Sequence, residues 1–180
     1  MTDLAGYILL KVSDVTRAQW ALRSATSLAR TVRVKGRPKV QNEGTLIIGD
    51  RVKLVSTVAA LELAVGLGGK LEIGDRSFIN YGTAISALSS VQIGPRCLIG
   101  TYCLIMDNAF HRLEPDRRME RPESGPAVLE ENVWLGARVI VMAGVTIGAD
   151  SAVGAGSVVT RDVSPGSVAA GVPARVVRDL

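Results

Sequence analysis

The single histidine of the chain, His111, is the residue with the most versatile chemistry. An imidazole exchanges its proton near neutral pH, so a histidine can serve as a general base or a general acid. Asp107 lies four residues upstream, close enough to orient one ring nitrogen if the chain turns between the two. An ordinary loop histidine is the alternative that the residue type alone leaves open. A zinc site with three histidines is excluded, because the chain has one.

Two cysteines, Cys97 and Cys103, are the other reactive side chains. They lie six residues apart with no CxxC motif and no Cys/His cluster, so the sequence predicts neither a zinc site nor a disulfide framework. A free cysteine also behaves as a small buried hydrophobic residue. We therefore expect both to fill space in the interior, and we expect no metal to be required.

A period of six residues is the strongest pattern around these side chains. Aliphatic residues recur at this spacing, and the register slips by two residues after Val91 before the pattern resumes. The aliphatic positions are Leu61, Leu67, Ile73, Ile79, Ile85, Val91, Ile93, Ile99, Ile105, Leu135, Val141, Ile147, Val153 and Val159. Small residues follow four positions later at Ser77, Thr83, Ser89, Cys97, Cys103, Ser151 and Ser157. Glycine comes directly after many aliphatic residues, at Gly74, Gly94, Gly100, Gly136, Gly148 and Gly154.

Neither a helical period of 3.6 nor a strand period of two explains this repeat. A coil of short strands does, because each hexapeptide then forms one flat side of a prism. The aliphatic residue points inward, the small residue fills the corner, and the glycine supplies a turn with positive φ. Successive coils pair in parallel and stack a continuous aliphatic core, which suits 19 glycines and only seven aromatic residues. The sequence therefore predicts a mainly β solenoid.

Three segments interrupt the repeat and define the expected organisation. Residues 1–43 are predicted to form a basic amphipathic helical arm, and residues 44–163 the β-helix domain with an extruded loop at about 106–127. Residues 164–180 are predicted to be a short C-terminal tail. The loop holds His111 and three prolines, and long loops in regular scaffolds are commonly functional.

The arm carries the positive charge of the chain. Residues 1–41 contain eight Lys and Arg against two Asp, a net +6, and the remainder nets −2. One or two helices are suggested by apolar residues at Leu4, Ile8, Val12, Val15, Trp20, Leu22 and Leu28. An anionic membrane is one partner that suits this charge, whereas the interpretation that we favour is a helix docked on the end of the solenoid with a solvated charged face. No nucleic-acid partner is predicted.

Length and composition limit the classes of protein to which the chain can belong. A chain of 180 residues with 47% hydrophobic residues has about one domain's length and is not wholly disordered. No run approaches the roughly 18 apolar residues of a membrane span, and the stretch from Leu4 to Val12 lacks the basic leader and cleavage site of a signal peptide. We expect a soluble cytoplasmic protein, with peripheral contact on the inner face of the membrane as an option.

The repeat region resembles the hexapeptide-repeat acyltransferases. The resemblance covers about residues 44–180 and is carried by VWLGARVIVMAGVTIGADSAVGAGSVVTRDV at 133–163, AGVPARVVR at 170–178 and GDRSFINYG at 74–82. The first two stretches are similar to the galactoside, maltose and polysaccharide O-acetyltransferases. The resemblance implies a left-handed parallel β-helix, an exception to right-handed crossovers. It also implies acetyl-CoA as cosubstrate and a homotrimer with grooves between neighbouring prisms.

The same resemblance assigns roles to residues. His111 matches the general base that takes the proton from an acceptor hydroxyl, and Asn80 matches an asparagine that helps to place the acceptor. Trp134 matches a tryptophan beside the pantetheine, with a core or interface aromatic as the alternative. The backbone N–H of Ala137 matches a donor to the thioester oxyanion. The coenzyme A groove is implied to be lined by Ala155, Thr160, Arg161, Arg175 and Arg178, and arginines suit its phosphates.

The acceptor expected from this resemblance is a sugar hydroxyl. The family's small-sugar enzymes commonly carry an acidic residue shortly after the asparagine segment, where this chain has ISAL at 85–88. Together with the charged loop and the basic arm, this departure favours a cell-surface polysaccharide or its lipid-linked or nucleotide-linked precursor. Transfer is expected to be direct, without an acyl-enzyme. One alternative is acetyl transfer to an amino sugar or to serine. The other is a non-catalytic scaffold protein.

Overall fold

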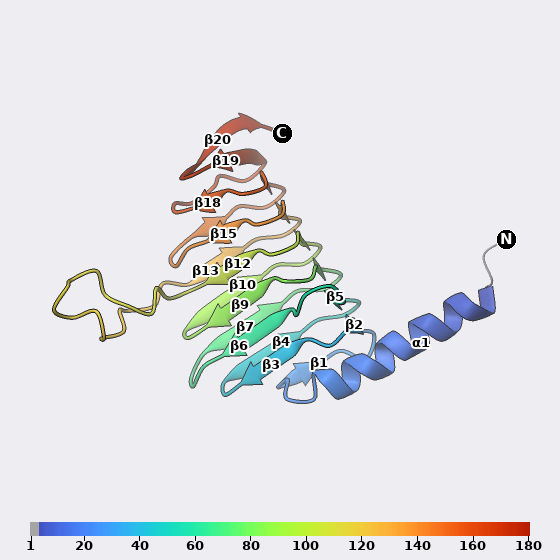
Figure 1. Cartoon of the computed structure of the whole chain (residues 1–180). Helices are drawn as coiled ribbons and strands as arrows, with labels where there is room; N and C mark the ends of the chain where they lie inside the picture. Colours follow the sequence, from blue (N-terminus) through green and yellow to red (C-terminus); the bar gives the residue numbers. More distant parts are fainter. Residues whose placement is uncertain (1–3) are drawn as a thin grey trace.

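Three β-sheets, parallel except for the last strand of one, wrap into a prism in the computed structural model (Figure 1). It describes the backbone of residues 4–180 and the side chains of residues 12–180. Each full coil contributes one short strand to each sheet. Sheet A contains β1 (Ser27–Leu28), β4 (Thr45–Ile48), β7 (Lys70–Ile73), β10 (Ser90–Ile93), β13 (Ala127–Leu129) and β16 (Thr146–Ile147). Sheet B contains β2 (Arg33–Gly36), β5 (Lys53–Ser56), β8 (Phe78–Ile79), β11 (Leu98–Ile99), β14 (Trp134–Leu135), β17 (Ala152–Val153), β19 (Ser167–Gly171) and β20 (Ala174–Asp179). Sheet C contains β3 (Lys39–Asn42), β6 (Glu62–Val65), β9 (Ala84–Ala87), β12 (Leu104–Met106), β15 (Ile140–Val141) and β18 (Val158–Val159), so the predicted parallel β-helix is confirmed.

The aliphatic residues of the repeat form the core inside the prism. With one exception, all of the predicted inward positions are buried. The exception is Leu67, which is 86% exposed. It lies in the four-residue turn 66–69 between β6 and β7, whereas the corresponding turn between β9 and β10 has only residues 88–89. The longer turn lifts Leu67 out of the ladder, and Val65 and Leu71 fill the core on either side of it.

The small corner residues are buried and join successive coils, as predicted. Ser77 Oγ donates to the Gly94 carbonyl at 2.8 Å and accepts from the Cys97 N–H at 3.0 Å. Cys97 and Cys103 occupy the same corner position one coil later and are 0% and 1% exposed. Ser89 departs from the pattern and is exposed, because its turn has only the residues 88–89 and lacks the corner position of a four-residue turn.

The recurring glycines allow close packing between coils and do not provide the turns. Gly100 does not have positive φ, and a Cβ built on it would lie 2.7 Å from the carbonyl carbon of Gly136 in the next coil. The left-handed conformation occurs two residues later, at Tyr102 (φ 57°) and likewise at Arg96 (φ 59°) after Gly94. The expectation of positive φ at these glycines was wrong, because the corner places the left-handed residue further along the turn.

The solenoid begins earlier than residue 44. β1, β2 and β3 pair in parallel with β4, β5 and β6, so a complete coil already lies within the expected arm. The hexad pattern of this first coil is weak. Parallel pairing with the next coil nevertheless provides hydrogen-bond partners for its backbone N–H and C=O groups. Leu28, expected in a helix, belongs to β1.

Within the described part of the chain, one helix, α1 (Leu4–Ala21), precedes this coil and extends away from the end of the solenoid (Figure 1). Ala18 and Leu22 are fully buried where the helix and the turn after it meet the prism. Val12 and Trp20, predicted on the apolar face, are 56% and 68% exposed, because the helix contacts the body only near its end. The side chains of Leu4 and Ile8 lie outside the described residues.

The last two segments that interrupt the repeat behave differently from each other. The loop 107–126 leaves the prism between β12 and β13 and projects outward, as expected (Figure 1). Residues 164–180 are not a simple tail, because β19 continues sheet B in parallel with β17 and β20 folds back antiparallel onto β19. The hairpin covers the open edge of sheet B, and Pro165 and Pro173 lie outside its strands.

No helix in the part of the chain that the structure describes is long and apolar enough to span a membrane.

Candidate active site

Stacked corners form edges along the prism, and two of these edges carry the predicted site residues. We call the turns between sheets B and C the BC edge, and those between sheets C and A the CA edge. The BC edge contains residues 80–83, 100–103, 136–139 and 154–157. The CA edge contains residues 66–69, 88–89, 142–145 and 160–163, and the loop 107–126 leaves from it.

His111 lies on this loop, and a backbone carbonyl holds its ring. The Nδ1 atom lies 2.8 Å from the carbonyl oxygen of Arg118, and the side chain is exposed. A carbonyl oxygen can only accept, so the neutral ring that makes this bond carries its hydrogen on Nδ1. The lone pair is then on Nε2, which is ready to accept a proton.

An ion cluster keeps the Arg118 carbonyl in place. Arg117 donates to Glu120 in a two-pronged contact, with Nη2 to Oε2 at 2.6 Å, and Arg112 Nε lies 3.4 Å from the same oxygen. The backbone N–H of Arg112 also donates to the Glu120 carbonyl at 3.2 Å. The Arg117 hydrogen bond lowers the pKa of the Glu120 carboxyl below its ordinary value. The charged residues of the loop therefore brace it on both sides of Arg118.

Asp107 anchors the loop and does not orient His111. Its side chain is fully buried, and its carboxylate accepts from the backbone N–H groups of Leu88, Ser89 and Ser90 at 2.6–3.0 Å. Both carboxylate oxygens are engaged by these donors, while the His111 ring contacts a carbonyl instead. The prediction that Asp107 orients the imidazole was wrong, because a buried carboxylate is best satisfied by the neighbouring turn.

Asn108 joins the two ends of the loop, a role that the sequence analysis did not assign. Its Nδ2 donates to the Pro122 carbonyl at 2.9 Å and to Ser124 Oγ at 2.8 Å, and its Oδ1 accepts from the Phe110 N–H at 2.6 Å. An asparagine at the start of a loop is a known turn signal and was available in the sequence. Arg118 acts through its carbonyl, for which the residue type gives no signal.

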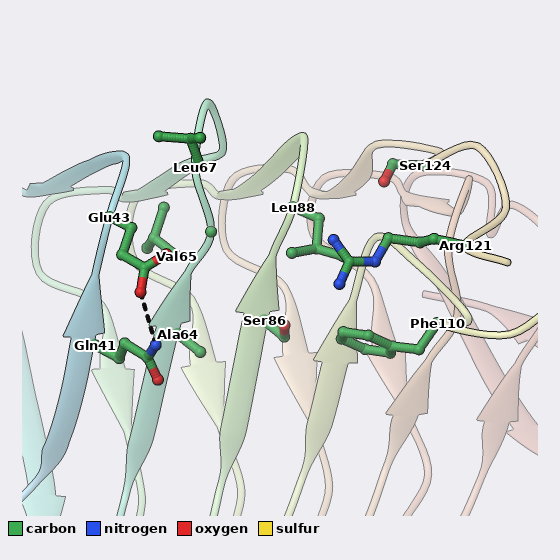
Figure 2. A pocket seen from close by; sticks show the side chains of 11 residues that line it. Gln41, Glu43, Ala64, Val65, Leu67, Ser86, Leu88, Phe110, Arg121 and Ser124 are labelled. Carbon is green, nitrogen blue, oxygen red and sulfur yellow. Dashed lines mark hydrogen bonds between the residues drawn. The ribbon is translucent and has the colours of Figure 1, made fainter. Parts of the chain in front are cut away.

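A pocket of about 450 Å³ lies between the loop and the outer surface of sheet C (Figure 2). Phe110 and Arg121 reach into it from the loop side, opposite Gln41 and Glu43. Gln41 Nε2 donates to Glu43 Oε1 at 3.0 Å. The remaining lining includes Leu67, Ser86, Leu88 and Ser124. The pocket thus combines an aromatic ring with a positively charged and a negatively charged hydrogen-bonding side chain. This combination suits the binding of a polar ring such as a sugar.

Two of the predicted coenzyme A residues lie along one row of sheet B. Trp134 is 57% exposed and pairs with Ala152, which pairs with Val168 of β19. Val168 in turn pairs with Arg178 of β20. The C-terminal hairpin thereby places an arginine on the same row as the exposed tryptophan, three strands away.

Three further predicted residues lie at the BC edge. Ala137 and Ala155 are at the same corner position in successive coils, joined by the Gly156 N–H to Ala137 carbonyl bond at 2.8 Å. Arg175 pairs with Ala170 at the C-terminal end of this edge. The backbone N–H of Ala137 donates to no group among the described residues, so it is available to a ligand.

Asn80 lies on the BC edge two coils before Ala137. Its Oδ1 accepts from the Tyr81 N–H at 2.9 Å, and its Nδ2 donates to none of the described residues. Its own N–H donates to the Ile99 carbonyl at 3.1 Å, so the backbone is fixed by the next coil. The half-buried side-chain amide therefore keeps N–H groups that no described residue accepts.

The other predicted residues lie on the CA edge. Thr160 and Arg161 are exposed there, and His111 projects from the loop of the same edge. Sheet C separates the two edges, and four residues of strand span roughly 13 Å. Within one chain the loop that carries His111 therefore leaves from a different edge than the one that holds Asn80, and the predicted residues form two groups, not one.

The cysteines offer no exposed nucleophile. Burial raises the pKa of the Cys97 thiol to about 11 and also raises that of Cys103. Their Sγ atoms lie near the carbonyl oxygens of Glu130 and Gly136, at 3.1 and 3.2 Å. Both are buried thiols, as predicted. Within the described residues, no three His, Cys, Asp or Glu side chains gather as metal ligands would.

Comparison with known proteins agrees with this architecture. The family model described as "Bacterial transferase hexapeptide (six repeats)" matches residues 126–161. The galactoside O-acetyltransferase of Escherichia coli K12 is 38% identical over 116 residues, covering 63% of this chain and 56% of that protein. The enzyme of the same name from Lactococcus lactis is 38% identical over 115 residues, covering 63% and 55%. The chain spans little more than half the length of these relatives.

Solved structures extend the likeness to the whole fold. A hexapeptide-repeat acetyltransferase from Vibrio cholerae superposes with a TM-score of 0.72 at 27% identity, covering 98% of this chain and 89% of that one. The acetyl coenzyme A complex from Vibrio cholerae O1 gives a TM-score of 0.62 at 27% identity, covering 100% and 92%. Fold and repeat define a hexapeptide-repeat β-helix protein. Its repeat and its fold are similar to those of the hexapeptide-repeat acetyltransferases.

Proposed function

We propose that the protein transfers an acetyl group from acetyl-CoA to a hydroxyl of a sugar acceptor. The acceptor class that we infer is a cell-surface polysaccharide or its precursor. The observation that carries the proposal is the contact between His111 Nδ1 and the Arg118 carbonyl. A ring held in this way presents an unprotonated Nε2, which is what a general base for an alcohol requires. The relatives named as acetyltransferases support the same reaction.

The mechanism uses few residues of this chain. His111 Nε2 takes the proton from the acceptor hydroxyl as its oxygen bonds to the thioester carbonyl carbon. The Ala137 N–H donates to the oxyanion that forms, and the Asn80 amide holds the acceptor. When the carbon–sulfur bond breaks, His111 returns the proton to the departing thiolate. Acetyl ester and coenzyme A are the products, and no acyl-enzyme forms because neither cysteine is exposed.

We infer that the active site is shared between subunits of a homotrimer. Asn80, Trp134 and Ala137 lie on sheet B and the BC edge, whereas His111 projects from the CA edge. Two copies side by side would supply the missing edge to each other. The coenzyme A groove would then use Ala155, Arg175 and Arg178 of one copy, with Thr160 and Arg161 of the other.

Substitution of the histidine tests the proposal directly. His111→Gln should lower kcat roughly 10²- to 10⁴-fold in an assay of coenzyme A release, because a general base contributes that much. Its affinity for coenzyme A in calorimetry should not change. Arg118→Ala is the matched control, since it keeps the carbonyl, and it should retain activity. Full turnover by His111→Gln would contradict the mechanism, and a panel of sugar, amino-sugar and serine acceptors would identify the acceptor class.

The peripheral membrane contact suggested by the basic N-terminal segment also stays a prediction. Co-sedimentation with anionic vesicles that disappears at about 0.5 M salt would support it, because screening weakens such contacts. Binding that persists at that salt concentration would contradict an electrostatic contact.

A further inference from the structure

A second pocket, at the N-terminal end of the solenoid, carries arginines that the transfer reaction does not use. It has a volume of about 450 Å³ and lies between the end of α1 and the turn joining β2 to β3. Arg17, Trp20 and Arg23 line it from the helix side, and Arg37 lines it from the turn. We call it the basic pocket, because three arginines line it and none of its lining residues is acidic.

Two of the three guanidinium groups have no counter-ion among the side chains that the structure describes. Arg17 Nη1 lies 3.3 Å from Asp14 Oδ1, so its charge is partly compensated. Arg23 and Arg37 form no ion pair with any described side chain. Arginines in this state attract anions, and their planar fork of donors matches the oxygens of a phosphate.

Trp20 adds a surface for a group attached to the anion. Trp20 is 68% exposed, and the Arg23 guanidinium lies 5.0 Å from the ring centroid. Arg23 also donates to the Trp20 carbonyl at 3.1 Å, which fixes the arginine beside the ring. A ligand with a phosphate and an apolar or ring-shaped neighbour fits this combination.

The basic pocket lies on the same edge of the prism as Asn80. Lys35 pairs with Val55, and Leu54 pairs with Ile79, so Lys35 is in the column of Asn80, two coils nearer the N-terminus. Arg37 follows in the turn of that first coil. Neighbouring strands are about 4.8 Å apart, so two coils correspond to roughly 10 Å along the axis. A sugar joined to a phosphate can span this distance.

We propose that the basic pocket binds the phosphate or pyrophosphate group of the acceptor, which makes the acceptor a sugar activated through phosphate. The link to the acceptor rests on the proposed function, because it uses the place of Asn80 in the reaction. The anion site itself depends only on Arg23, Arg37 and Trp20. In the activated sugar, the phosphate pairs with the arginines while the sugar extends along the BC edge toward Asn80.

Calorimetry with inorganic pyrophosphate tests the anion site on the full chain. Saturating coenzyme A is present throughout, so that its own phosphate site is occupied. Arg23→Gln/Arg37→Gln should weaken pyrophosphate binding about tenfold or more, the loss expected for charge-assisted hydrogen bonds. Arg30→Gln/Arg76→Gln removes the same charge from two exposed arginines outside the pocket and should change the affinity less than about twofold.

Three results would overturn the anion site. They are absence of pyrophosphate binding by the unaltered protein, equal weakening in both double variants, and a loss of oligomer mass in Arg23→Gln/Arg37→Gln. The last result would assign the pocket to a subunit interface. Sedimentation measures the mass for both double variants.

Two ligands identify the source of the phosphate. Tighter binding of UDP than of pyrophosphate, lost in Arg23→Gln/Arg37→Gln, would indicate a nucleotide-linked sugar. Co-sedimentation with vesicles that contain a polyprenyl pyrophosphate, lost in the same variant, would indicate a lipid-linked sugar.

Turnover separates this inference from the proposed function. If the anion site binds but no sugar is acetylated, the proposed function is wrong and the site stands. If phosphorylated acceptors are acetylated equally by the unaltered protein and by Arg23→Gln/Arg37→Gln, the link between the pocket and the acceptor is wrong.

Discussion

At the scale of single residues, the buried thiols are the ionisable groups with the clearest environment. Cys97 and Cys103 lie in the corner ladder with almost no exposed surface. Because burial raises both pKa values, the thiols stay protonated at pH 8 and the reactive thiolate is scarce. We expect negligible reaction with a disulfide reagent in the folded protein and release of two thiols in denaturant. Rapid labelling of the folded protein would contradict this assignment.

The same pKa shift has a consequence for stability. In the unfolded chain Cys97 ionises near its ordinary value of 9.0, whereas in the folded chain it ionises at about 11. The unfolded state therefore releases its proton first, so the contribution of Cys97 to the free energy of unfolding is constant below about pH 9 and is lost as the pH rises from about 9 to about 11. The loss from Cys97 is on the order of 2 kcal/mol. Denaturant titrations of the protein and of Cys97→Ser at pH 8 and pH 10.5 measure it, and an equal fall in both would contradict the attribution.

Residue type was enough to single out His111 and Asn80 as candidates, and their roles stay predictions. Among the described residues, His111 Nε2 and Asn80 Nδ2 have no hydrogen-bond partner. The sequence did not point to Arg118, because a backbone carbonyl is independent of residue type. It misplaced Asp107 because spacing along the chain does not say which way a loop turns at its base.

At the scale of elements, the clamp at the base of the loop decides where His111 lies. Asp107→Asn replaces one oxygen with an amide that faces the N–H groups of residues 88–90. We expect it to destabilise the protein by about 2–3 kcal/mol, the cost of unsatisfied buried groups. We also expect kcat to fall about tenfold or more, since misplacing a catalytic group is costly.

An exposed aspartate of the same loop supplies the control. Asp116→Asn removes the same charge at an exposed position and should leave stability and kcat unchanged. Thermal unfolding and coenzyme A release measure both quantities. If Asp107→Asn instead kept its stability while the pH dependence of kcat shifted, Asp107 would act on His111 directly.

Close stacking of the coils gives a second prediction at this scale. A Cβ on Gly100 would lie 2.8 Å from the Ala137 nitrogen, so Gly100→Ala must push two coils apart. We expect a loss of several kcal/mol, above the usual range of point mutants, together with lower activity because the Ala137 N–H moves. Gly68→Ala is the control, since its Cβ meets nothing within 4 Å and costs only the strain of positive φ, about 1 kcal/mol. Equal losses in chemical denaturation would contradict the packing argument.

The elements themselves were predictable to the extent that the repeat was strong. The hexads from Ile73 to Val159 fixed the coils, because buried aliphatic residues at a constant spacing leave one inward face. The first coil was missed, because the pairing of β1 to β3 with their neighbours supplies what the weak pattern lacks. The hairpin of β19 and β20 was also missed. Pro165 and Pro173 end the hexad repeat, but they do not prevent one strand from forming between them and another after Pro173.

At the scale of the whole molecule, the proposed binding sites follow one another along the axis of the prism. The basic pocket lies in the first coil, Asn80 in the third, and the predicted coenzyme A residues in the coils that follow β13. Acceptor and cofactor would therefore approach the reaction centre from opposite ends of a groove. One chain supplies only one wall of that groove at the level of His111. Assembly is thus part of the proposed chemistry, and sedimentation should give a mass about three times the 19.0 kDa of one chain.

Complementation between two inactive variants tests the shared site. Asn80→Ala and His111→Gln each remove a residue from a different edge, so each homotrimer should be inactive. In a mixed trimer, one interface combines the intact His111 of one subunit with the intact Asn80 of its neighbour. Random mixing of equal amounts after unfolding and refolding should restore about a quarter of the unaltered activity, because three quarters of cyclic trimers are mixed and each has one complete site of three. The double variant Asn80→Ala/His111→Gln, refolded with unaltered subunits, controls for refolding yield. Recovery of no activity from two well-folded variants would mean that each chain contains its own site, and the loop would then have to reach the BC edge of its own prism.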